Sequence, residues 1–159
     1  MKEKKKDGVY IACSMIKSKK IDLSLLNFLI NYSENQGYHP FTPGKMDDAT
    51  PKEIYERDIK MLSQSQIILA DVNEPSHGVG MEIMYGIKHD IPVICLIMKN
   101  NFPLSRMVEG SPNTLILDYE TEKELEEKME KIRIEEIKIK LCKNCKEKTF
   151  HMNNECIKC

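Results

Sequence analysis

The chain has 159 residues, which suits one compact domain with a small appendage, because single domains usually contain about 100–200 residues. Hydrophobic residues make up 41% and charged residues 31%, a composition that excludes a disordered chain. The net charge of −1 gives no electrostatic argument for binding nucleic acid or a membrane. No segment reaches the ~18–20 apolar residues of a membrane span, and the N-terminus lacks the apolar region of a signal peptide, so we expect a cytoplasmic protein.

Short apolar runs alternate with segments of helical periodicity along most of the chain. The helix expected after Thr50 has a clear start signal, because the threonine can act as N-cap with proline at the first helical position and Glu53 at the third. The alternation predicts an α/β fold, a Rossmann-like parallel sheet flanked by helices, with right-handed crossovers. In chain order we expect a strand at 8–14, a helix at 24–36, a strand at 38–42, a loop at 43–51, a helix at 51–63, a strand at 65–72, a helix at 79–89, strands at 91–98 and 115–117, and a charged helix at 122–140.

Two loops of this expected sheet follow strands, and open α/β sheets bind ligands beyond the carboxyl ends of their strands. The first loop spans residues 13–19, and the second spans residues 73–80 and opens a helix. In the second loop, Gly78 and Gly80 allow close approach of the backbone, and the helix start offers free N–H groups to an anion. Two glycines before a helix would also suit a simple tight turn.

Three separated motifs make the pattern specific: Gly78-Val-Gly-Met-Glu82 with a serine upstream, Tyr10-Ile-Ala-Cys-Ser14, and Tyr55-Glu-Arg-Asp58. Together they resemble the nucleoside 2-deoxyribosyltransferase superfamily, and most closely its 2′-deoxynucleoside 5′-phosphate N-hydrolases. The resemblance covers residues 8–120, with matching order and nearly matching spacing. It implies an N-glycosidase that splits a nucleoside 5′-monophosphate into a free base and (deoxy)ribose 5-phosphate.

The resemblance also implies the catalytic residues. Glu82 resembles the nucleophile that attacks C1′ and forms a covalent glycosyl-enzyme, a role that suits a carboxylate because the transition state is oxocarbenium-like. Asp58 resembles the aspartate that binds the sugar or base and assists proton transfer, and Tyr10 the tyrosine that orients the nucleophile. Each also has an ordinary structural interpretation: a charge complementing the helix dipole, a surface charge and a core aromatic, respectively.

A phosphate site follows from the same resemblance. Ser14, Ser76 and Gly78 match positions that hold the 5′-phosphate, and Gly80 belongs to the same loop. Ser105 resembles a serine that a neighbouring subunit lends to this site, which implies a homodimer sharing its active sites; it would alternatively be the N-cap of a short helix.

The chain departs from this branch at the first loop. An Ile-Arg-Gly-Gly-Arg-like run is replaced by Met15-Ile-Lys-Ser-Lys19, so Lys17 and Lys19 would meet the phosphate as point charges. His77 stands where the branch usually has leucine. These changes leave open the identity of the base and the choice between ribose and deoxyribose.

Two Cys-x-x-Cys pairs, Cys142 with Cys145 and Cys156 with Cys159, lie ten residues apart at the C-terminus. Four thiolates suit a closed, structural zinc site, and a reducing cytosol favours metal over disulfides. A redox dithiol or an iron–sulfur site stays open. We therefore expect a tail at 1–7, a catalytic domain at 8–140 with a core of its own, and a zinc knuckle at 141–159 that unfolds alone when metal is removed.

Two other functions remain. A transferase that moves deoxyribose between bases is disfavoured by Ser76, because transferases of the superfamily tend to carry an acidic residue near that position. A non-catalytic nucleotide-sensing module is disfavoured because binding alone would not need Glu82, Asp58 and Tyr10 together.

Overall fold

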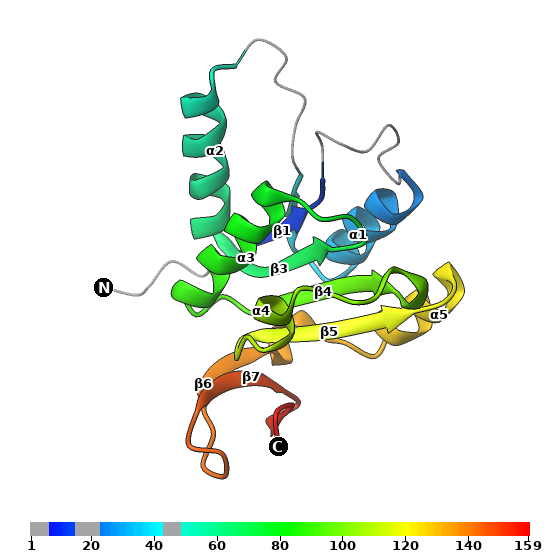
Figure 1. The fold of residues 1–159 in the computed structure, drawn as a ribbon, viewed down its shortest axis with the longest axis vertical. Coiled ribbons are helices and arrows are strands. Elements are labelled where there is room, and N and C mark those ends of the chain that lie inside the picture. The colour runs from blue at the N-terminus through cyan, green and yellow to red at the C-terminus, as the bar shows by residue number, and fades with distance from the viewer. Residues whose placement is uncertain (1–6, 15–22, 43–48) are drawn as a thin grey trace.

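The computed structural model describes residues 7–14, 23–42 and 49–159. Five parallel strands form one sheet in the order β2-β1-β3-β4-β5, with helices on both faces (Figure 1). The predicted α/β fold is therefore confirmed. The elements of this part are β1 (Gly8–Ala12), α1 (Leu23–Asn35), β2 (His39–Phe41), α2 (Pro51–Ser63), β3 (Ser65–Asp71), α3 (His77–Lys88), β4 (Val93–Met98), the short 3-10 helix η1 (Lys99–Asn101), α4 (Arg106–Glu109), β5 (Thr114–Tyr119) and α5 (Glu122–Met129).

The three central strands, β1, β3 and β4, are buried on both faces, and their alternate residues belong to two different cores. On β1, Val9 and Ile11 pack with side chains of α1 and α5. Tyr10 and Ala12 point to the opposite face, into a cluster that includes residues of α2 and α3. The alternation therefore places Tyr10 on the side of the sheet covered by α2 and α3, the helices that contain Asp58 and Glu82.

The start of α2 confirms the capping prediction. The Glu53 N–H donates to the Thr50 side chain at 3.3 Å, and the Thr50 N–H donates to the Glu53 carboxylate at 2.8 Å. This reciprocal pair of hydrogen bonds fixes where α2 begins. Asp58, further along α2, lines a cavity together with residues of α3.

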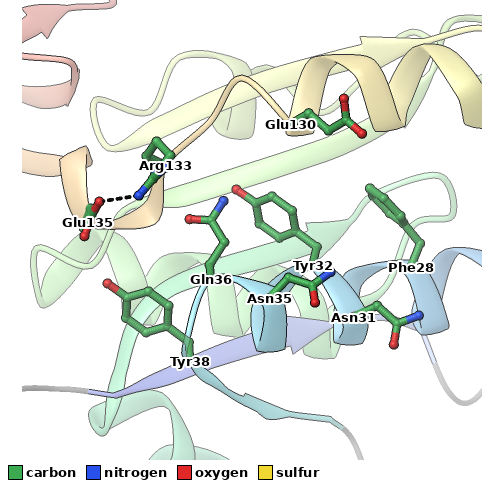
Figure 2. A pocket seen from close by; sticks show the side chains of 9 residues that line it. All are labelled: Phe28, Asn31, Tyr32, Asn35, Gln36, Tyr38, Glu130, Arg133 and Glu135. Carbon is green, nitrogen blue, oxygen red and sulfur yellow. Dashed lines mark hydrogen bonds and ion pairs between the residues drawn. The ribbon is translucent and has the colours of Figure 1, made fainter.

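The helix predicted at residues 122–140 is wrong, because α5 ends at Met129. Three isoleucines beyond its end, Ile132, Ile134 and Ile137, are buried by a segment that is not α-helical. Tyr32 of α1 and Gln36, the residue after its end, donate to the carbonyl of Ile132 at 2.8 and 2.7 Å, and the Ile134 N–H donates to Gln36 Oε1 at 3.0 Å. Figure 2 shows both side chains beside the segment that carries Arg133. Tertiary hydrogen bonds thus replace the helical ones, which the sequence periodicity could not reveal.

The chain then forms a three-stranded antiparallel sheet in the order β6-β7-β8 (Figure 1). Phe150 of β7 is fully buried in the core beside α1 and α5, and its N–H donates to the carbonyl of Pro112 at 3.1 Å. Lys148 forms an ion pair with Asp90. The C-terminal segment is therefore packed onto the main domain. Its elements are the 3-10 helix η2 (Ile134–Glu136), β6 (Lys138–Leu141), which crosses the boundary predicted at 140, β7 (Lys148–Met152) and β8 (Glu155–Cys156).

Candidate active site

Three elements bring the predicted catalytic side chains together at one side of the sheet. The Tyr10 hydroxyl of β1 donates to Glu82 Oε1 of α3 at 2.7 Å. The negative charge of Asp58, on α2, raises the pKa of both groups. The structure thus gathers three residues that are scattered along the sequence.

The N-terminus of α3 is open. Ser76 is its N-cap and accepts a hydrogen bond from the Val79 N–H at 3.4 Å, so the helix begins two residues before the predicted position 79. A Cβ atom added to Gly80 would meet no described atom outside its own helix backbone within 4 Å, and one added to Gly78 would meet only the Ser76 hydroxyl, at 3.9 Å. Packing within the described chain does not require these glycines, which leave room for a ligand at the helix start.

The carboxyl group of Glu82 is buried and has a raised pKa. Burial raises its pKa to about 7; the hydrogen bond from Tyr10 lowers the pKa, and the charge of Asp58 raises it. Its Oε2 atom is buried and receives no hydrogen bond from any residue that the structure describes. One oxygen is therefore held by Tyr10, and the other is an acceptor without a partner among the described residues.

Arg57 places a cation beside the two carboxylates of the site. The Nε and Nη2 atoms of Arg57 both donate to Asp58 Oδ1, at 2.8 and 2.7 Å. Its positive charge also lowers the pKa of Glu82. The sequence gives Arg57 no evident role, although it belongs to the motif that ends at Asp58. Only its place beside a candidate catalytic aspartate was available as a signal.

A cavity of about 810 Å³ lies between α2 and α3, a size that suits a nucleotide-sized ligand. The predicted site residues that line it are Asp58, Ser76, Gly78, Gly80 and Glu82, and His77 lines it as well.

A second cavity, of about 260 Å³, is lined by the loop before α3 and by the segment that leads into α4. Ser76 and Ser105 both line it, and Ser105 is the N-cap of α4 without a side-chain capping bond. Ser14 is half-buried just beyond the end of β1. Lys17 and Lys19 lie outside the described residues, as does most of the loop predicted at 43–51.

Cys13 and Cys95 have the properties of unreactive thiols. Cys95 is fully buried in β4, and burial raises its pKa to about 12. Cys13 is half-buried beside the site, where burial together with Asp71 and Glu82 raises its pKa to about 11. Neither thiol ionises readily at neutral pH.

The four C-terminal cysteines form a group that can hold a metal ion. Their sulfur atoms all lie within 4.8 Å of one another, with 3.4 Å between Cys142 and Cys159 and 4.0 Å between Cys145 and Cys156. A tetrahedral ion with metal–sulfur bonds of about 2.3 Å separates its sulfurs by about 3.8 Å. The donor set and its spacing therefore fit a four-thiolate metal site.

No protein-family model matches the chain. The chain is 34% identical over 110 residues to a protein of Thermofilum pendens provisionally named 2′-deoxynucleoside 5′-phosphate N-hydrolase 1, across 64% of this chain and 76% of the relative. It is 31% identical over 105 residues to the 5-hydroxymethyl-dUMP N-hydrolase of Danio rerio, across 62% of this chain and 73% of the relative.

The structure of a CMP N-glycosidase from Clostridium botulinum shares the fold, with a TM-score of 0.61 at 19% identity, across 77% of this chain and 98% of that chain. The chain belongs to the 2′-deoxynucleoside 5′-phosphate N-hydrolase family, within the nucleoside 2-deoxyribosyltransferase superfamily. The resemblance stated from its motifs is confirmed. None of the helices in the described ranges combines the length and apolar character needed to cross a membrane.

Proposed function

We propose that this protein is an N-glycosidase that hydrolyses a nucleoside 5′-monophosphate to a free base and (deoxy)ribose 5-phosphate. The observation that carries the proposal is the buried Glu82 carboxyl group, which lines the cavity with one oxygen held by Tyr10 and the other without a described partner. Membership in the N-hydrolase family supports the same reaction.

The reaction proceeds in two displacements. The Glu82 carboxylate attacks C1′, the C1′–N bond breaks with its electron pair passing to the base, and the base takes up a proton. Water then attacks C1′ of the glycosyl ester, loses a proton, and releases the sugar phosphate with Glu82 restored. Tyr10 holds Oε1 so that Oε2 can approach the sugar, and Asp58 binds the sugar or base and assists proton transfer.

The 5′-phosphate would bind at the start of α3. The Ser76 hydroxyl and the Gly78 N–H lie at a helix N-terminus, where the dipole and free N–H groups favour an anion. Ser14 would contribute a second hydroxyl and Gly80 the space for close approach. Lys17 and Lys19 would add positive charge from the first loop.

We propose a homodimer in which Ser105 reaches the phosphate of the partner. Large apolar side chains exposed on α2, α3 and α4 support an interface: Tyr55, Met81, Met84 and Met107. Mixing a Glu82→Gln chain with a Ser105→Ala chain tests the sharing. If Ser105 acts across the interface, the mixed dimer regains one intact site and measurable activity; if it acts within its own chain, mixing restores nothing.

We propose that the four-cysteine group holds structural zinc, because four thiolates complete the coordination and leave no open position for catalysis. A reducing, cytoplasmic compartment would keep these cysteines available to the metal. The division into a tail at 1–7, a domain at 8–140 and a knuckle at 141–159 stays a proposal, now with a knuckle that shares the main core through Phe150. A redox or iron–sulfur role is the alternative, which metal analysis distinguishes.

The decisive experiment incubates the purified protein with a panel of ribo- and deoxyribonucleoside 5′-monophosphates and separates the products by chromatography. Free base together with sugar 5-phosphate supports the hydrolase. A new nucleoside formed only when a second base is supplied would support the transferase, and binding without turnover of any nucleotide would support the sensing module.

A further inference from the structure

One asparagine joins the ends of three neighbouring strands beside the site. Asn73 lies two residues beyond the end of β3, near the start of the loop that leads to Ser76. Its Nδ2 atom donates to Asp71 Oδ1 of β3 at 2.7 Å and to the Tyr119 hydroxyl of β5 at 3.0 Å. Its Oδ1 atom accepts from the Met98 N–H of β4 at 2.7 Å and from Asn101 of η1 at 2.9 Å.

These contacts use the whole hydrogen-bonding capacity of the side chain. An asparagine amide has two N–H donors and an oxygen with two lone pairs, and each has a partner here. Aspartate would lack the donors and would set a second carboxylate against Asp71. Alanine would leave four polar groups without their common partner, some of them in a partly buried position.

The position of this network relates it to the proposed phosphate site. Asn73 and Asn101 line the 260 Å³ cavity together with Ser76 and Ser105. The side-chain bonds of Asn73 hold the start of the loop that carries Ser76. They also fix the end of β4, from which the chain runs to Ser105. Glu82, by contrast, is held from β1 by Tyr10.

We infer that Asn73 is a positioning residue for phosphate recognition, which sets Ser76 and the α3 N-terminus at their places relative to β4 and β5. This inference rests on the proposed function and names a residue that acts through others, without touching the reacting atoms. Because charge-assisted hydrogen bonds depend on donor placement, loosening the anchor should weaken binding of the phosphate more than the chemistry at C1′.

The experiment compares wild type with Asn73→Ala, using a nucleoside 5′-monophosphate, its parent nucleoside, and inorganic phosphate as a competitive probe. We expect KM for the nucleotide and the inhibition constant for phosphate to rise at least about tenfold. The kcat for the nucleotide and the kcat/KM for the nucleoside should stay within about threefold, because Tyr10 still holds Glu82. A general loss of structure would lower kcat and nucleoside turnover as well.

Two milder variants guard against poor folding of Asn73→Ala. Tyr119→Phe removes one acceptor, and Asn101→Ala one donor, while Asn73 remains; each should shift the phosphate constant in the same direction by a smaller factor. Equal phosphate constants in wild type and all three variants would overturn the inference. Calorimetric binding of inorganic phosphate reads this out independently, so a wild type that binds phosphate but hydrolyses no nucleotide would refute the proposed function alone.

Discussion

The Tyr10 hydroxyl lies 2.7 Å from Glu82 Oε1, although 72 residues separate the two in the chain. Tyr10 comes from a central strand with its ring fully buried, and Glu82 from the second turn of the helix that crosses that face of the sheet. The hydrogen bond fixes one carboxylate oxygen, and burial raises the pKa of the carboxyl group. This relationship underlies the first three predictions.

Replacing Glu82 with glutamine should abolish base release while the fold is kept. Glutamine has the same shape and can still accept the Tyr10 hydrogen bond, but it cannot act as the nucleophile. Losing a covalent nucleophile should reduce kcat by several orders of magnitude. Chromatographic assay of free base tests this, with circular dichroism as the control for folding. Turnover within about tenfold of wild type would remove Glu82 from the mechanism.

The rate should depend on pH through Glu82, whose pKa is raised to about 7. The carboxylate is the reactive form, so kcat/KM should fall as the pH drops below about 7. Tyr10→Phe removes a hydrogen bond that favours the ionised form, so its acidic limb should move to higher pH. The measurement is kcat/KM against pH for both proteins, and an unmoved limb in Tyr10→Phe would contradict this account.

Glu82→Gln should also stabilise the free protein at alkaline pH. The folded state raises the pKa of Glu82 from 4.5 to about 7, so between these values the native protein binds the proton more tightly than the unfolded chain. Native stability is therefore lost as pH rises through this window, and glutamine removes that loss. We expect a gain on the order of 1–3 kcal/mol at high pH. Urea unfolding should show this gain above pH 7 and none below 4.5.

The 5′-phosphate should be required for efficient turnover. Two or three charge-assisted hydrogen bonds of roughly 1.5–3 kcal/mol each would make the parent nucleoside a poorer substrate by about two orders of magnitude or more. Ser76→Asp should sharply reduce kcat/KM for the nucleotide, because it sets a negative charge against the phosphate. Ser63→Asp, which adds the same charge at an exposed position at the end of α2, is the matched control. Equal use of nucleotide and nucleoside by wild type would instead favour the transferase.

Metal analysis should find about one zinc per chain, bound by the four clustered cysteines. Removal by a chelator should lower the melting temperature of the whole protein, because Phe150 belongs to the core beside α1 and α5. Cys142→Ser should reproduce the shift, whereas Cys13→Ser, a thiol outside the cluster, should not. A chelated protein that loses only its C-terminal sheet and keeps its original melting temperature would show that the knuckle is an independent module.

Local sequence signals determined much of the sheet and its helices. The apolar runs became parallel strands because strands buried on both faces need continuous apolar side chains. The start of α2 was readable because its capping box involves only residues 50–53. The motifs at Tyr10, Asp58 and Glu82 were enough to indicate the family, because short motifs of functional residues can be recognised in the sequence before the fold is known.

Tertiary structure alone decided the rest, because the deciding contacts join distant residues. Nothing local shows that Tyr32 and Gln36 bind the backbone at Ile132, beyond the residue where α5 ends, in place of the longer helix predicted there. The pKa of Glu82 depends on burial between separate elements and on Tyr10. The four contacts of Asn73 include residues of three strands. In the sequence it is an ordinary loop residue, and it can link these strands only because they lie side by side in the fold.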